Sequence, residues 1–478
     1  MLAFSATALT RAYDLQCPRY VAWMTDGVER PRVRWEESPA GQVLAELGQD
    51  HEQRVVARLV PAGQAAVPQY PPGDLDAGAT ATIELIRAGV PFIYQGVLKG
   101  EVAPGVIVRG IADLLERHDG GYRVIEIKAS RRLKTSQVLQ AAAYTVLLEQ
   151  LTHAGDPIMV DGMYAQHVPP LEATLGILRE LVTQAIPRWL RAGDGSFHRT
   201  SRCAGCPFDP LCREDAHARR HLSLVAGCTP AVAVRLAATG VRDIPGLLAL
   251  SSEDLAHVGI DRHQLQRLKG QAQALAENRT VSTGDAPAPP AATVELFLEV
   301  EPDPTAPLPC RLGLLKRDKV KGLTAYRGLV MPTDPAEAAK KVRTFLELVI
   351  HQATKAAKGG ASWSFLYYGP GTVETLAELV TWMGWGDELL EEVLLHATDA
   401  LAVIRRGWHL PVERYGLRDV LEATGCATIP DDSPGFALHV TWRRTRDETL
   451  AVRLLEQGES TARALMALWD WVEGARAG

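Results

Sequence analysis

A two-residue segment, Asp-Gly at 119–120, separates two runs rich in Val and Ile, and it constrains the fold more than any other feature. Asp-Gly is a strong signal for a tight β-hairpin loop, because both central positions of that loop need positive φ angles. Counting outward from the loop places Asp113 directly opposite Glu126. Lys128 falls on the same face as Glu126, because side chains alternate along a strand. The sequence therefore predicts a hairpin over residues 106–129 with a fixed register.

The opposed acids of this hairpin are candidates for a metal site. Two carboxylates that face each other across paired strands repel, and a divalent cation between them removes that repulsion. Mg²⁺ and Mn²⁺ prefer oxygen ligands, so Asp113 and Glu126 are suitable donors. Lys128 can then orient a water molecule or stabilise charge that develops on a phosphate. The alternative is an exposed hairpin with scattered charges, since Glu-x-Lys triplets are common.

Two amphipathic helices are predicted on either side of the hairpin. Residues 41–59 form the first, and His51 lies in its middle, where it is a further metal ligand if this helix faces the hairpin. Residues 135–150 form the second, and Gln140 and Tyr144 share one face of it because they are four positions apart. The ordinary interpretations are a structural histidine and a surface Gln beside a half-buried Tyr. The short distance in sequence from Lys128 favours a role at the rim of the site.

Four of the seven cysteines form a second candidate site. Cys17 stands alone near the N-terminus, while Cys203, Cys206 and Cys212 lie together in CAGCPFDPLC. An odd number of cysteines, with no recognisable secretion signal, indicates a reducing cytoplasm, where clustered cysteines favour metal over disulfide. Cysteine chemistry alone permits either zinc or an iron–sulfur cluster. The remaining cysteines have no partner at ligand spacing and are predicted to be core residues: Cys228, Cys310 and Cys426.

The length of 478 residues predicts two to four domains. The net charge of −6 gives no global basic field, so a nucleic-acid partner would need local basic patches and bound cations. No apolar run is long enough to suggest a membrane span.

Long helices are expected at 335–357, 372–403 and 447–474, after a strand at 294–300. The predicted divisions are 1–218, of mixed strands and helices; 219–280, of short helices; 281–293, a Pro- and Ala-rich linker; and 294–478.

The hairpin and its flanking helices resemble the RecB-like branch of the PD-(D/E)xK nucleases. The motifs, in family order, are Gly48-Gln-Asp-His51-Glu52, Gly110-Ile-Ala-Asp113, Glu126-Ile-Lys128 and Gln140-Ala-Ala-Ala-Tyr144. The resemblance implies a restriction-endonuclease-like core in which His51, Asp113, Glu126 and the carbonyl of Ile127 bind Mn²⁺ or Mg²⁺. It implies a catalytic role for Lys128. Gln140 and Tyr144 would position the substrate or Lys128.

The cysteine layout also resembles members of this branch that carry a [4Fe–4S] cluster, with one cysteine before the nuclease core and three after it. Cys17, Cys203, Cys206 and Cys212 would hold such a cluster in preference to zinc, in a structural role. The rest of the chain resembles proteins that append a small all-α, helix–hairpin–helix-like module and a ribonuclease H-like α/β domain of the YprB type. That domain departs from its family where Glu299 replaces an expected Asp, and where Ser460 and Thr461 replace an acid pair. Its fold is expected to remain and its cleavage activity to be lost.

The resulting expectation is an α/β multidomain, cytoplasmic DNA nuclease. It would hydrolyse phosphodiester bonds as an exonuclease on single-stranded DNA ends, in repair, recombination or defence. A protein partner would bind through the C-terminal domain, and no membrane is involved. Two alternatives stay open. One is a non-catalytic iron–sulfur protein that binds nucleic acid or acts as a scaffold; the other is an end-trimming nuclease of the CRISPR-adaptation type. The long C-terminal extension counts against the latter.

Overall fold

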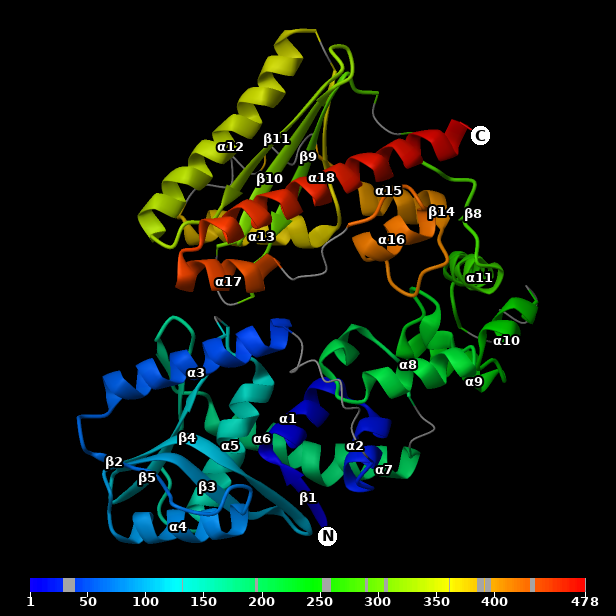
Figure 1. The fold of residues 1–478 in the computed structure, drawn as a ribbon. Coiled ribbons are helices and arrows are strands. Elements are labelled where there is room, and N and C mark those ends of the chain that lie inside the picture. The colour runs from blue at the N-terminus through cyan, green and yellow to red at the C-terminus, as the bar shows by residue number, and fades with distance from the viewer. Residues whose placement is uncertain are drawn as a thin grey trace. The chain divides into compact units, whose positions relative to one another are not determined.

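The computed structural model describes most of the chain in two compact units. The described residues are 1–28, 39–130, 132–193, 197–251, 259–288, 291–304, 308–360, 362–384, 391, 397–429 and 435–477. The units are Met1–Arg213 and Glu214–Gly478, which run from blue to green and from green to red in Figure 1. The predicted division of the second unit at residues 280 and 293 stays a prediction. No helix in the described ranges is both long and apolar enough to cross a bilayer.

A mixed sheet forms the centre of the first unit. Its strand order is β2-β3-β4-β5-β6-β7, and β1 pairs in parallel with one end of β4. Three long strands, β3 to β5, form an antiparallel meander, and β6 adds in parallel to β5. The strands are β1 (Leu2–Ser5), β2 (Ala65–Ala66), β3 (Phe92–Ala103), β4 (Val106–His118), β5 (Gly121–Ile127), β6 (Ile158–Val160) and β7 (Gln166–His167).

The predicted hairpin is confirmed as β4 and β5. Asp119 and Gly120 have φ angles of 48° and 77°, as a tight loop with two positive φ angles requires. The pairing runs from His118 with Gly121 to Leu114 with Ile125 in the predicted register. Asp113 and Glu126 are the next residues along the two strands. The turn therefore sets the position of both acids.

Helices cover this sheet and close its ends. Helix α5 is buried along most of its length, including a run of three alanines at 141–143 that lets it lie close to β3 and β5. Helix α3 packs against β5, and α1 against α5. The helices of this part are α1 (Ala6–Leu15), α2 (Pro18–Thr25), α3 (Pro39–Leu59), α4 (Leu75–Arg87), α5 (Thr135–Glu149), α6 (Leu171–Glu180), α7 (Ile186–Ala192) and α8 (Asp209–Ala218).

The second unit contains a five-stranded sheet with helices on both faces. Its order is β11-β10-β9-β12-β13, in which β9 to β11 are antiparallel while β12 and β13 run parallel to β9. Alternation along β9 divides the core: Leu296 and Leu298 pack with α12 and α13, and Phe297 packs with α15, α16 and α18. The strands are β9 (Val294–Glu301), β10 (Arg311–Asp318), β11 (Leu323–Val330), β12 (Trp363–Tyr367) and β13 (Ala397–Asp399).

The helices of this unit correct one prediction. The expected helices at 335–357 and 447–474 are confirmed as α12 and α18, but a single helix over 372–403 is wrong. Helix α13 ends at Trp382, Gly384 has a positive φ of 63°, and residues 397–399 form β13. The helices are α9 (Pro230–Ala238), α10 (Ile244–Ala249), α11 (Arg262–Glu277), α12 (Pro335–Lys358), α13 (Pro370–Trp382), α15 (Ala400–Gly407), α16 (Leu417–Thr424), α17 (Gly435–Thr445) and α18 (Glu448–Ala477).

Candidate functional site

Asp113 and Glu126 are linked to each other through the backbone of the hairpin. The Asp113 amide donates to Glu126 Oε1 at 3.3 Å, and the Ile127 amide donates to Asp113 Oδ2 at 2.7 Å. Glu126 is fully buried, whereas 17% of the Asp113 side chain is exposed. The structure therefore brings the two predicted acids together, one inside the fold and one at its surface.

The ammonium of Lys128 bridges both acids. Its Nζ lies 2.5 Å from Glu126 Oε2 and 3.4 Å from Asp113 Oδ2. Burial, and then the charge of Asp113, raises the pKa of Glu126 to about 8. Burial alone would lower the pKa of Lys128, but the two carboxylates outweigh it and raise that pKa. A buried negative site of this kind needs a cation.

Glu52 is a further acid of this site, and the sequence reasoning passed over it in favour of its neighbour His51. Burial, and then the charge of Asp113, raises the pKa of Glu52, and Lys128 opposes this effect. Glu52 also accepts hydrogen bonds from Tyr94 and from the Gln95 amide. The position of Glu52 directly after His51 is the sequence feature that could have indicated this role.

Gln95 is the residue of strand β3 that contacts Glu52. The pairs Tyr94 with Leu114 and Gly96 with Ala112 place Gln95 opposite Asp113. Gln95 has a φ of 58°, which is uncommon for a residue other than glycine and interrupts the regular strand there. Its side chain donates to Glu52 Oε1. Asp113 is thus flanked by Glu126 on one neighbouring strand and by Gln95 on the other.

His51 lies on α3 but contacts a different part of the sheet edge. Its buried ring is 4.8 Å from the ring of Tyr164, and burial lowers its pKa, an effect that the Asp161 backbone opposes. Its Nε2 has no hydrogen-bond partner among the described residues. In that part of the chain, donor atoms of His51, Asp113 and Glu126 do not all come within 4.8 Å of one another. Its role as a ligand stays a prediction.

Tyr144 and Gln140 connect helix α5 to the strand that carries Asp113. The Tyr144 hydroxyl donates to the Ile111 carbonyl at 3.1 Å, and Gln140 Nε2 donates to that hydroxyl at 3.4 Å. A Cβ on Gly110 would lie 2.4 Å from the hydroxyl oxygen, so the glycine of the Gly-x-x-Asp motif makes room for Tyr144. Burial, and then the charge of Glu126, raises the pKa of Tyr144. This pair therefore lies beside the acids.

The four cysteines of the second candidate site are neighbours in the fold. Cys17 directly precedes α2, Cys203 lies in the 3-10 turn at Ser201–Gly205, Cys206 follows that turn, and Cys212 lies in α8. All of them are free thiols. Burial, assisted by the charges of the other three, raises the pKa of Cys206 to about 12. Burial, opposed by Arg19 and assisted by Cys17 and Cys203, raises that of Cys212 to about 11.

Two contacts near these thiols stabilise negatively charged sulfur and so oppose the effect of burial. Arg19 is buried, with its guanidinium 3.5 Å from the Phe197 ring centre and Nη1 3.9 Å from Cys212 Sγ. The Thr200 amide donates to Cys203 Sγ at 3.4 Å. Thiolates on one tetrahedral zinc lie about 3.8 Å apart, given a Zn–S bond of about 2.3 Å. Within the described residues, no three of these sulfurs lie within 4.8 Å of one another.

Comparison with known proteins gives a match for the first unit. Neither a curated protein nor a solved structure matches this sequence. Residues 9–213 match the model of the PD-(D/E)XK nuclease superfamily, and the range includes the acid pair, Lys128, Tyr144 and all four clustered cysteines. This part of the chain is therefore a PD-(D/E)XK nuclease superfamily domain.

Proposed function

We propose that this protein is a metal-dependent DNA nuclease whose active site is built on the β4–β5 hairpin. The superfamily match supports a nuclease that uses a divalent metal such as Mg²⁺ or Mn²⁺ and acts on nucleic acid. The observation that carries the proposal is the contact of Lys128 with both Asp113 and Glu126. Two acids and one lysine in contact, with one acid at the surface, form a site that a phosphate group can reach.

The acids fit a hard divalent cation. Asp113 and Glu126 would hold it through carboxylate oxygens, with Glu52, the Ile127 carbonyl and His51 as further candidates. Such an ion polarises a phosphoryl oxygen and makes a bound water more acidic. With a cation bound, the acids would no longer need the charge of Lys128, and its ammonium could orient the attacking water or stabilise charge on the phosphate. Tyr144, held by Gln140 and Ile111, lies close enough to Lys128 for the lysine charge to lower its pKa, against the effect of burial.

The substrate and cofactor proposals go further than the superfamily does. We propose single-stranded DNA ends as the substrate and exonucleolytic cleavage as the mode, as the RecB-like motifs imply. A reducing cytoplasm is the proposed location, because clustered cysteines favour metal over disulfide there. We also propose that Cys17, Cys203, Cys206 and Cys212 hold a [4Fe–4S] cluster rather than zinc. Their mutual proximity, the buried Arg19 and the amide donor to Cys203 support this. The cluster would tie the segment before α2 to the end of the domain.

Residues 294–478 are proposed to form a ribonuclease H-like domain that does not cleave nucleic acid. Its five-stranded sheet with helices on both faces supports an α/β domain of this kind. Glu299, where the resemblance places a metal ligand, forms a buried ion pair with Arg311. A guanidinium in that position supplies the positive charge that a metal ion would supply. A role in binding nucleic acid or a protein partner follows, with the helices at 219–280 as a further nucleic-acid contact.

The first test is degradation of end-labelled single-stranded DNA with Mn²⁺ by anaerobically purified protein. Wild type is expected to cut, Lys128→Ala to lose activity, and Lys99→Ala, a substitution at an exposed lysine of β3, to behave as wild type. The fate of the label gives the polarity. A broad absorption band at about 400 nm in the same samples would report the cluster.

Two results would contradict this proposal in different ways. Wild type that does not cut, despite an intact cluster, favours the alternative of an iron–sulfur binding or scaffold protein. Cleavage that survives in Lys128→Ala would place the active site elsewhere. An end-trimming role of the CRISPR-adaptation type would instead appear as shortening of duplex ends to a fixed length.

A further inference from the structure

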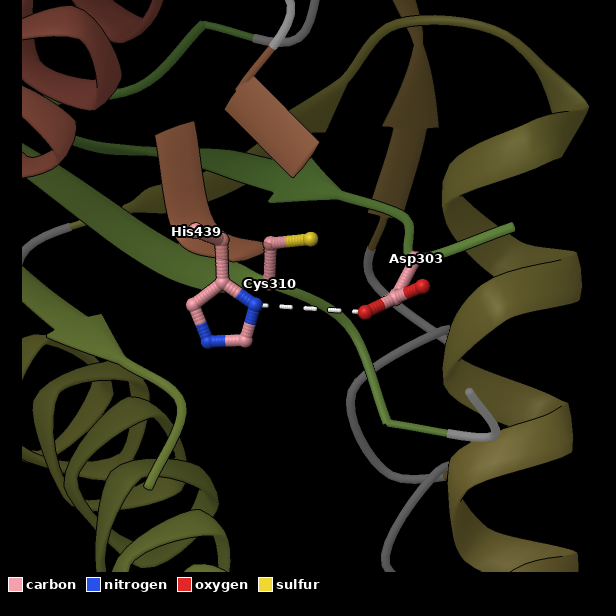
Figure 2. Close-up of side chains that lie close together, drawn as sticks. All are labelled: Asp303, Cys310 and His439. Carbon is pink, nitrogen blue, oxygen red and sulfur yellow. Dashed lines mark ion pairs between the residues drawn. The ribbon is translucent and has the colours of Figure 1, made fainter. Parts of the chain in front are cut away.

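Three side chains with metal-binding atoms meet where β9 ends and β10 begins. Asp303 lies just beyond β9, Cys310 directly precedes β10, and His439 comes from α17. All three residues are buried, and one donor atom from each lies within 4.8 Å of the others. Figure 2 shows an imidazole nitrogen of His439 directed at the Asp303 carboxylate, with Cys310 close to both. Residues far apart in the sequence thus converge in the second unit.

The hydrogen bonding of His439 leaves one ring nitrogen available to a cation. Its Nε2 lies 2.9 Å from the Met331 carbonyl oxygen, which can only accept, so Nε2 carries a proton and donates it. Nδ1 is buried and has no hydrogen-bond partner in the described ranges. It lies 3.9 Å from Asp303 Oδ2, which is too far for a shared proton. A histidine that donates one N–H to a carbonyl while the other nitrogen faces a carboxylate is arranged as a metal ligand.

We propose that Asp303, Cys310 and His439 form a zinc site in the C-terminal unit. Sulfur, imidazole nitrogen and carboxylate oxygen together are a donor set that suits Zn²⁺ better than Mg²⁺. Nitrogen and oxygen ligands of a tetrahedral zinc lie about 3.4 Å apart, given bonds of about 2.1 Å. The observed 3.9 Å between Nδ1 and Oδ2 needs only a small contraction. Three protein ligands leave one position of the tetrahedron for a water molecule.

The site is distinct from the carboxylates of strand β9 that the resemblance assigns to catalysis. Glu299 is paired with Arg311, and the backbone amides of Gly435 and Phe436 hydrogen-bond Glu301. The proposed role is structural. The amide of Cys310 donates to the Glu301 carbonyl, and the Met331 amide donates to the Cys310 carbonyl, so Cys310 is fixed to neighbouring chain segments. A zinc ion would join these segments to α17.

The test is the zinc content of the full chain after purification with zinc and dialysis against buffer. Cys310→Ala and His439→Ala are each expected to lose about one zinc ion per chain relative to wild type. Cys426→Ala is the matched control, because Cys426 is a cysteine of the same unit outside the site, and it should lose none. Cys17, Cys203, Cys206 and Cys212 are unchanged in all variants. Any zinc that they hold therefore cancels when the zinc content of a variant is subtracted from that of wild type.

Substitution with Co²⁺ gives a second readout, independent of nuclease activity. A thiolate–cobalt charge-transfer band should weaken in Cys310→Ala, and the oxygen-rich site at Asp113 contributes no such band. Asp303→Asn keeps the size of the side chain, so it tests metal loss even if Cys310→Ala does not fold. Equal zinc content in wild type, Asp303→Asn and His439→Ala would overturn the proposal and leave an ion pair between Asp303 and His439.

Discussion

Arg311 binds Glu299 through two parallel hydrogen bonds between adjacent strands of the C-terminal sheet. Nε lies 3.0 Å from Oε2 and Nη2 lies 2.7 Å from Oε1, while Nη1 donates to the Leu454 carbonyl at 2.7 Å. Both side chains are buried. Two-point pairing of this kind fixes the geometry as well as the charge. Glu299 is therefore held by the protein itself.

Removing one member of this pair should destabilise the C-terminal unit strongly. Arg311→Met leaves the Glu299 carboxylate buried without its partner, which typically costs about 3–5 kcal/mol. The double variant Arg311→Met/Glu299→Leu removes both charges and should recover most of the loss. Urea unfolding followed by far-UV circular dichroism measures both. A double variant as unstable as the single one would show that packing, rather than charge, is responsible.

Lys128→Met should destabilise the metal-free protein and leave the metal-bound protein less affected. Without the ammonium, the ionised forms of Asp113 and Glu126 repel each other with no cation between them, so a loss of about 3–5 kcal/mol is expected in EDTA at a pH above about 8, the pKa of Glu126. Saturating Mn²⁺ restores the missing positive charge and should return most of that stability. Thermal unfolding with and without Mn²⁺ measures the effect, with Lys99→Met as the control. No rescue by Mn²⁺ would argue against a cation site at these acids.

Glu52 should contribute to metal binding although it lies on α3 rather than on the hairpin. Glu52→Gln keeps the contact with Gln95 but removes a charge close to Asp113, and a loss of about 10- to 100-fold in Mn²⁺ affinity is expected. Isothermal titration with Mn²⁺ measures it directly. Glu84→Gln, at an exposed position of α4, is the matched control. Unchanged affinity in Glu52→Gln would restrict the ligands to the hairpin and leave Glu52 a structural role.

The parts of the site that could be predicted from the sequence are those fixed by local geometry. The loop at Asp119 and Gly120 determines the register of β4 and β5, so the meeting of Asp113 with Glu126 followed from six residues on either side of a turn. The contact of Glu52 with Gln95 depends on how α3 packs across the sheet and on a positive φ in the middle of β3. No local pattern encodes either of these.

The same distinction explains the errors and omissions in the second unit. A helical apolar period continues through 372–403, but the chain leaves α13 at Trp382 and β13 forms at residues 397–399. Pairing with β12 satisfies the backbone groups of β13, and this tertiary contact overrides the local pattern. Cys310 is buried, as predicted. Nothing in the sequence indicated that Asp303 and His439 lie beside it, because only the fold brings these three residues together.

Gly110→Ala should disturb the site through Tyr144. The added Cβ would lie 2.4 Å from the Tyr144 hydroxyl oxygen, so the strand or helix α5 must shift, at a cost of about 1–3 kcal/mol. Tyr144→Phe removes that oxygen, and the double variant should be more stable than the sum of the single effects predicts. Chemical unfolding of the four proteins gives the coupling energy. Additive effects would show that the clash is relieved elsewhere.

Mn²⁺ binding should strengthen as pH rises towards 8. The pKa of Glu126 is raised from 4.5 to about 8 in the metal-free protein, by burial and by the charge of Asp113, and a metal ion binds only its ionised form. Each pH unit below about 8 should therefore weaken Mn²⁺ binding by up to about tenfold, with a plateau above it.

The raised pKa of Glu126 has the opposite effect on the stability of the metal-free protein. The folded state holds the proton of Glu126 more tightly than the unfolded state, so the contribution of this residue to stability is greatest below pH 4.5 and falls as pH rises to about 8. Glu126→Gln should remove both dependences, and a wild-type affinity independent of pH between 6 and 8 would show that Glu126 is already ionised.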